Sequence, residues 1–187
     1  MILVRVAVWM ALALAIVVVE RRLGHPASVQ SPVNKLTDQL MSLATMATLA
    51  AGLAGSLVLG LGAIQPGWAS LALGIAAGTL GIGLRAVSMR TLGRFYTLTP
   101  GIEPGQTLIT AGPYRLVRHP GYLAILLSLA GLQLVLGTWV ALAAMVLVIL
   151  PLPVRIAIEE RILAEHFSAQ YADYRRRTPY RLVPGIV

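Results

Sequence analysis

The chain has 187 residues, of which 57% are hydrophobic and 12% are charged; its mean hydropathy is +0.79 and its formal net charge is +8. This composition excludes an ordinary soluble domain and predicts an all-α integral membrane protein, with residues 1–187 forming a single membrane domain. The lack of cysteine excludes disulfides and thiolate sites, and the basic charge indicates membrane topology rather than nucleic-acid binding, because no soluble basic module is present.

Three apolar runs in residues 1–89 are long enough to span a membrane as helices. The first covers residues 1–19 and is followed by Glu20-Arg21-Arg22 instead of a small-residue cleavage site, so we expect a spanning helix and not a signal peptide. A polar loop leads to the second run, 36–64, and the third covers 68 to about 89. We expect the second and third helices to form a hairpin. Glycine spacing in the third, Gly74-x-x-x-Gly78, permits close helix packing.

A polar segment, residues 90–119, follows the third predicted span. It carries the turn signals Pro100-Gly101, Pro104-Gly105 and Gly112-Pro113 and two short β-prone pieces, 95–98 and 107–110. We expect a short, compact loop region that is folded against the membrane face.

Two shorter apolar runs come next, 122–136 and 139–154, separated by Gly137-Thr138, where Thr138 can cap the second helix. As helices they would be about 22 and 24 Å long, shorter than a hydrocarbon core of about 30 Å. We still expect two spans here, and about five in all, because one helix of the combined length would overshoot the membrane.

The carboxyl-terminal end combines a predicted kink with a predicted amphipathic helix. Pro151 and Pro153 remove two helical donors, so a kink there could open a pocket. Apolar and aromatic residues recur at near-helical spacing over residues 161–174, and three arginines follow at 175–177. We expect an interfacial helix facing anionic membrane lipids, which could also cover a cytoplasmic pocket.

Basic residues fall almost entirely on one side of this five-helix arrangement. Only Arg5 lies on the other side, and the connections near Pro66 and Gly137 carry no charge. Because arginine and lysine accumulate on the cytoplasmic side, the amino terminus is predicted outside and the carboxyl terminus in the cytoplasm.

Both ends of the predicted hairpin 122–154 then bring polar residues to the cytoplasmic face. Pro120 suits the first turn of a helix and makes His119 project where backbone N–H groups are open to a ligand. Arg155 and Glu159 share a helix face, so they form either a simple ion pair or, because ionisable groups at membrane depth are costly, part of a functional pocket. Glu160 points about 100° away and is expected to contact the loop region or solvent.

These residues resemble the isoprenylcysteine carboxyl methyltransferases and their phospholipid methyltransferase relatives. The resemblance covers roughly the carboxyl-terminal half and is carried by Arg118-His119-Pro120-Gly121-Tyr122 and, one hairpin later, Glu159-Glu160-x-x-Leu163. The sequence departs from the family at Ala124 and Ser168, where glycine is usual. The resemblance divides the chain into residues 1–89, a three-helix part that should shape the substrate entrance, and residues 90–187, the part that binds the cofactor and carries catalysis.

The resemblance implies S-adenosyl-L-methionine as the cofactor and S-adenosyl-L-homocysteine as the product. No metal-ligand spacing appears in the sequence, so we expect no metal. Methyl transfer from a sulfonium needs positioning and electrostatics rather than a covalent enzyme intermediate. Arg155 and Glu159 are the expected catalytic residues, with Arg155 reaching the acceptor. The expected cofactor contacts are Gln106, Thr107, Leu108, Ile109, Tyr114, His119, Pro120, Gly121, Tyr122 and Glu159.

The leading hypothesis is a membrane methyltransferase that acts on a small lipophilic acceptor from the bilayer, through oxygen or sulfur. Fourteen of the fifteen basic residues are arginine, which is typical of a GC-rich bacterial genome, so we expect the bacterial inner membrane. One alternative is phospholipid N-methylation, which needs a pocket that stabilises a cationic headgroup. A second alternative, from a different class, is a non-catalytic assembly factor or transporter subunit.

Overall fold

The computed structural model describes all of the chain except residues 1, 25–31, 60–62, 66 and 186–187. The described residues form helices and loops with no β-strand, so the predicted all-α membrane fold is confirmed and the β-prone pieces 95–98 and 107–110 form no sheet. The long helices are α1 (Ile2–Leu23), α2 (Pro32–Ala54), α3 (Gly67–Leu92), α4 (Pro120–Leu136) and α7 (Leu152–Phe167). The shorter ones are η1 (Gly55–Leu59), η2 (Gly93–Phe95), η3 (Gly112–Arg115), α5 (Trp139–Ala143), α6 (Val146–Ile149) and α8 (Ala169–Arg177).

Four stretches are long and apolar enough to cross a membrane: 2–23, 35–57, 67–95 and 139–167. The predicted fourth span corresponds to α4, a shorter apolar helix of 17 residues, so the total of five stays a prediction. Large apolar side chains are exposed along the outer faces of the long helices, among them Leu3, Leu14 and Leu80. An apolar exterior of this kind is what a hydrocarbon environment favours.

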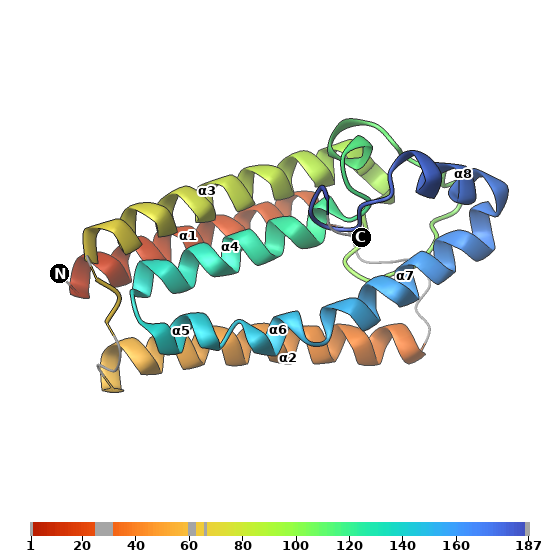
Figure 1. Ribbon diagram of the computed structural model, residues 1–187. Coiled ribbons are helices and arrows are strands. Elements are labelled where there is room, and N and C mark those ends of the chain that lie inside the picture. Colours follow the sequence, from red (N-terminus) through yellow and green to blue (C-terminus); the bar gives the residue numbers. More distant parts are fainter. Residues whose placement is uncertain (1, 25–31, 60–62, 66, 186–187) are drawn as a thin grey trace.

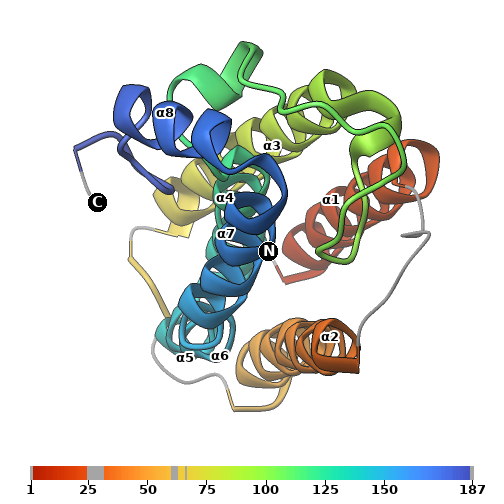
Figure 2. The same cartoon turned by 90° about the vertical axis from the view of Figure 1, so that its right-hand side faces the viewer.

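The helices are arranged in two layers (Figure 1). One layer contains α1, α3 and α4; the other contains α2 with the chain of short helices α5 and α6. The predicted hairpin of the second and third helices is therefore wrong, because α3 packs along α4 and α2 packs along α5 and α6. Viewed from the end, α7 crosses between the two layers (Figure 2).

Small residues explain why α3 packs closely against α4. A Cβ atom at Gly74 would lie 2.6 Å from the backbone N of Val135, and one at Gly81 would lie 2.5 Å from the backbone N of Ser128. Gly131 on α4 faces Gly78 on α3 in the same way. The predicted close packing at Gly74 and Gly78 is confirmed, and its partner is α4.

Arg5 joins the far ends of three helices of this layer. Its side chain is buried and donates to the carbonyl oxygen of Val135 at 2.7 Å, to that of Gly67 at 2.5 Å and to Ser70 Oγ at 3.1 Å. A guanidinium at the carboxyl end of α4 meets carbonyl groups that have no helical partner and the negative end of the helix dipole. The one basic residue on this side of the predicted topology thus has a structural role.

The last predicted span is longer than expected. The helix that contains α5, α6 and α7 runs with kinks from 139 to 167 instead of ending at 154, and one break lies at Pro151, as the prolines predicted. The predicted single helix 161–174 is interrupted at Ser168, whose φ of 45° is the left-handed value that favours glycine. This turn sends α8 back over the loop region, which is where α8 helps to close the site.

Candidate functional site

A cavity of about 540 Å³ lies between the two helix layers, below the loop region. Its wall is apolar on the side formed by α1, α2 and α4, where Ile16, Met41, Met46, Ile125 and Leu129 face it. Its other side is polar and is formed by the loop 95–109, the start of α4 and residues 155–163 of α7. This size is in the range of small-molecule sites, and the division suits a ligand with one polar and one apolar part.

The structure brings nearly all of the predicted site residues together around this cavity. Pro120 is the exception: it is buried at the first turn of α4 and does not line the cavity. The predicted residues that line it are Gln106, Thr107, Leu108, Ile109, Tyr114, His119, Gly121, Tyr122, Arg155 and Glu159. Their roles stay predictions, but their convergence follows from the fold, because α4 begins at the loop region and the chain returns to the loop region through α7.

Arg155 is held by two helices and a loop. Its Nε donates to the Tyr122 hydroxyl at 3.1 Å and its Nη2 to the carbonyl oxygen of Leu98 at 2.9 Å. Its Nη1 forms an ion pair with Asp38 and donates to Thr37 Oγ1 at 3.3 Å, both on α2. The simple Arg155–Glu159 pair considered from the sequence is therefore not the pair that forms in the described residues.

Sequence reasoning missed Asp38, although a signal was present. Asp38 is the only acidic residue between Glu20 and Glu103, and it lies within an apolar stretch long enough to cross a membrane. Ionisable groups in such stretches face a cavity or a partner. The side chain of Asp38 does both, since it lines the cavity and pairs with Arg155.

Glu159 presents a carboxylate to the cavity. Its side chain is 30% exposed, and its Oε1 lies 3.8 Å from Nδ1 of the buried His119. It also interacts with the Tyr122 hydroxyl. Among the described residues it contacts no arginine, so this carboxylate can meet a cationic group of a ligand.

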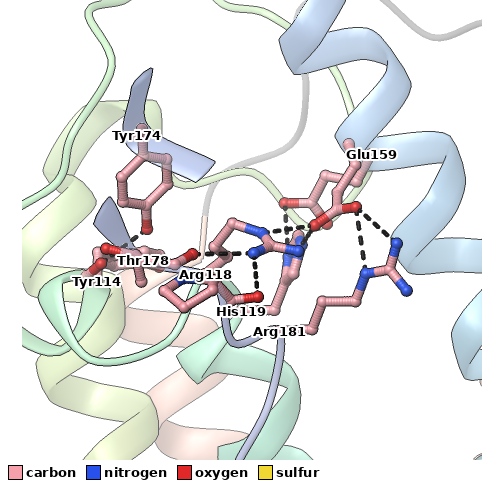
Figure 3. A network of polar contacts seen from close by, with 9 residues as sticks. Tyr114, Arg118, His119, Glu159, Tyr174, Thr178 and Arg181 are labelled. Atoms are coloured by element: carbon pink, nitrogen blue, oxygen red, sulfur yellow. Dashed lines mark hydrogen bonds and ion pairs between the residues drawn. The ribbon is translucent and has the colours of Figure 1, made fainter. Parts of the chain in front are cut away.

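Glu160 is buried, and its carboxylate contacts both the start of α4 and the carboxyl-terminal segment. Figure 3 shows Arg118, His119 and Arg181 gathered beside α7 in this network of polar contacts. Its Oε1 accepts from Arg118 Nε at 2.7 Å and lies 3.3 Å from His119 Nε2, and its Oε2 lies 3.2 Å from Arg181 Nη2. Arg118 also donates through Nη1 to the carbonyl oxygens of Thr178 and Pro179. The expectation that Glu160 contacts the loop region or solvent is right for the loop and wrong for solvent.

The same cluster changes the expected role of the helix start. The backbone N–H of Arg118 donates to the Tyr180 carbonyl and that of His119 to the Arg181 carbonyl, each at 2.9 Å. These two N–H groups, which directly precede the first turn of α4, are therefore not open to a ligand. The carboxyl-terminal segment occupies them and fixes the position of His119, while Glu159 reaches His119 from the other side.

Aromatic groups complete the polar end of the cavity. Arg85 donates to Glu20 at 2.6 Å and lies over the Tyr96 ring, 5.1 Å from its centre. The Tyr174 hydroxyl of α8 donates at 2.7 Å to the Tyr114 carbonyl, which holds α8 against the loop region. Burial raises the pKa of Tyr96, Tyr114 and Tyr174 above the usual value, so these walls stay uncharged at neutral pH.

Comparison with known proteins agrees with the sequence resemblance. The model of the isoprenylcysteine carboxyl methyltransferase (ICMT) family matches residues 73–165. The cobalt-zinc-cadmium resistance protein CzcN of Cupriavidus metallidurans is 38% identical over 102 residues, which are 54% of this chain and 47% of that protein. Protein-S-isoprenylcysteine O-methyltransferase B of Arabidopsis thaliana is 34% identical over 103 residues, covering 54% of this chain and 52% of the relative. The chain thus spans about half the length of these curated relatives.

The fold also has a solved counterpart. The structure of the eukaryotic intramembrane Ras methyltransferase ICMT superposes with a TM-score of 0.62 and covers 85% of this chain and 55% of the other. At 22% identity, this likeness concerns the fold alone. With 85% of this chain covered, the likeness of the fold extends beyond residues 73–165.

Proposed function

We propose that the chain is an integral membrane enzyme of the isoprenylcysteine carboxyl methyltransferase family, whose model matches residues 73–165, and that it methylates a lipophilic acceptor. The proposed cofactor is S-adenosyl-L-methionine, which supplies a methyl group bonded to a positively charged sulfur. The observation that carries the proposal is the cavity itself: its polar end holds the Glu159 carboxylate, which contacts no arginine in the described part of the chain, and its other end is apolar. The first end suits a cationic cofactor and the second a lipid tail.

The residues at the polar end are assigned as follows. Glu159 binds a positively charged part of the cofactor, because its carboxylate faces the cavity beside uncharged tyrosines. His119 is kept in place by Glu160 and by the chain end, so it limits how Glu159 can turn. Gln106 and Ile109 belong to the loop that covers the cavity. This loop excludes water, which would slow the reaction by solvating the nucleophile.

The acceptor is proposed to enter from the bilayer, between the layer of α1 and α4 and the layer of α2. Methionine and isoleucine side chains line this side, and they suit a flexible apolar tail. Arg155 stands where the apolar and polar parts of the cavity meet, so it can orient the reacting end of the acceptor. We further propose a bacterial inner membrane location, with the amino terminus outside and the cavity mouth at the cytoplasmic face.

Two of the relatives are named as metal resistance proteins, CzcN and the nickel-cobalt-cadmium resistance protein NccN. In the described part of the chain no group of three histidine, cysteine, aspartate or glutamate side chains is placed to hold a metal ion. The proposal for this chain therefore rests on the cavity and the family, and the predicted lack of a metal stays a prediction.

The proposal is tested with purified protein in liposomes that contain bacterial lipid extract and labelled S-adenosylmethionine. We expect label to enter an extractable lipid, and we expect Glu159→Gln to weaken cofactor binding about tenfold or more, because a charge-assisted contact is lost. Glu165→Gln is the matched control, since Glu165 is on the same helix, exposed and paired only with Arg161. Equal cofactor binding by the two variants would contradict the assignment of Glu159.

A further inference from the structure

Every arginine that lines the cavity is already paired with a carboxylate. In the described part of the chain the three pairs are Arg85–Glu20, Arg118–Glu160 and Arg155–Asp38. Glu159 is the lining carboxylate without such a partner. An anionic acceptor would therefore find no uncompensated cation at the polar end of this cavity, and it would add a like charge beside carboxylates.

Arg155, the residue at the junction of the polar and apolar parts, has little capacity left. A guanidinium has five N–H donors. Four are directed to Tyr122, Thr37, Asp38 and Leu98 by the described contacts, which leaves one donor on Nη2. A carboxylate binds arginine most strongly through two parallel N–H groups, so a single remaining donor suits a hydroxyl or thiol better.

Asp38 is placed to meet the same group. Its Oδ1 pairs with Arg155, and its side chain lines the cavity and stays 24% exposed, so the carboxylate can be reached from the cavity. Asp38 lies on the face of α2 that also carries Met41 and Thr45, and this face forms one wall of the apolar part of the cavity. A lipid lying along α2 would therefore present its polar end to the Asp38–Arg155 pair.

We propose that the acceptor is an uncharged, protic group on a lipophilic molecule, a phenol or a thiol, and that Asp38 takes its proton. This inference rests on the proposed methyl transfer and narrows its acceptor class. A carboxylate acceptor is disfavoured because it would have to displace Asp38 from Arg155. Phenols and thiols have pKa values of about 10 and about 8.5, respectively, and lose a proton far more readily than aliphatic alcohols. A carboxylate base can therefore assist them during the transfer.

The step balances with the groups named. The acceptor O–H or S–H bond breaks and the proton goes to the Asp38 carboxylate, while Arg155 donates to the acceptor atom. A lone pair of that atom forms the new bond to the methyl carbon, and the carbon–sulfonium bond breaks with its electron pair remaining on sulfur. Asp38 is the catalytic residue of this step. It belongs to residues 1–72, which lie outside the region that the family model matches.

The test compares acceptors that share one tail, a pentadecylphenol and the corresponding pentadecylbenzoate, with farnesyl thiol as the sulfur counterpart. Binding is measured to the protein saturated with S-adenosylhomocysteine, and methylation is measured in liposomes. We expect the unmodified protein to bind the phenol about tenfold more tightly than the benzoate and to methylate it faster. The phenol and thiol arms distinguish oxygen from sulfur as the acceptor atom.

Asp38→Asn should lower methylation of the phenol about a hundredfold and reverse the order of binding, because Arg155 then has a free charge for the benzoate. Asp173→Asn, which changes an exposed aspartate, should behave as the unmodified protein. Retained binding of S-adenosylhomocysteine shows that Asp38→Asn is folded. The preference of the unmodified protein for the phenol over the benzoate tests the inference without any variant.

Preference of the unmodified protein for the benzoate, or unchanged phenol methylation by a folded Asp38→Asn, would overturn the inference while the proposed function stands. Failure of the unmodified protein to bind S-adenosylmethionine would instead remove the proposed function and this inference with it.

Discussion

Replacing Glu160 by glutamine should show how strongly the carboxyl-terminal segment is clamped to the start of α4. The glutamine keeps the shape of the side chain but removes the charge that faces Arg118 at 2.7 Å, His119 at 3.3 Å and Arg181 at 3.2 Å. Breaking a buried ion pair by neutralising one partner costs about 3–5 kcal/mol, because the other charge stays buried. Arg118 keeps two carbonyl acceptors and the Arg181 side chain is 45% exposed, so the low end, about 3 kcal/mol, is expected.

For a chain of this size, such a loss lowers the melting temperature by about 6–12 °C. The measurement is thermal unfolding in detergent, followed by tryptophan fluorescence. Glu165→Gln is the matched control on the same helix; its exposed pair with Arg161 should contribute nothing measurable, so this variant should melt with the unmodified protein. If Glu160→Gln melted together with Glu165→Gln, the clamp would not be a stabilising contact and the reasoning from burial would be wrong.

Three other changes test the fold around the site by the same unfolding assay. Gly131→Val should be strongly destabilising, because its side chain would collide with the backbone of Gly78; an unchanged melting temperature would contradict the α3–α4 packing. Ser168→Gly should raise the melting temperature by about 2–4 °C, since it removes about 1 kcal/mol of strain at a φ of 45°, and a decrease would contradict that conformation. Burial raises the pKa of Tyr114 and Tyr174, so their contribution to stability is complete below about pH 10 and is lost at higher pH, where the tyrosines of the unfolded chain ionise. Tyr174→Phe should therefore lose less stability at alkaline pH than the unmodified protein. An equal loss would refute the burial of the Tyr174 hydroxyl.

The sequence predicted the parts of the site that depend on hydropathy and on local motifs. Apolar runs and charge asymmetry predicted that the start of α4 and the Arg155–Glu159 part of α7 lie on one face. The convergence of His119, Tyr122, Arg155 and Glu159 followed from that prediction. The family motif selected the residues that line the cavity. The close packing at Gly74 was also predictable, because glycine at four-residue spacing has few other uses in a membrane helix.

What the sequence could not predict are the contacts between segments that are far apart in the chain. The Arg155–Glu159 spacing suggested a local pair, but the long side chain of the arginine reaches α2 and pairs there with Asp38, 117 positions away. Helix neighbours in a membrane are chosen by the fit of small and large side chains, for which hydropathy carries no signal. For the same reason the hairpin of the second and third helices was wrong.

The end of the chain shows a second limit of this kind. Amphipathic spacing over residues 161–174 predicted one helix at the membrane surface. The same spacing is found in helices that pack on lipid and in helices that pack on protein, so it does not distinguish the two. The break at Ser168 turns α8 onto the loop region, where Tyr174 is buried against Tyr114. Backbone N–H groups of Arg118 and His119 are then taken by residues 180 and 181, which no local pattern indicates.

The central claim, that the cavity is the cofactor site of a methyltransferase, is tested most directly by calorimetric titration of the purified, folded protein with S-adenosylmethionine. The account predicts saturable binding of one cofactor per chain, competition by S-adenosylhomocysteine, and about tenfold or more weaker binding by Glu159→Gln than by Glu165→Gln. No saturable binding by a preparation that shows a cooperative unfolding transition would contradict it.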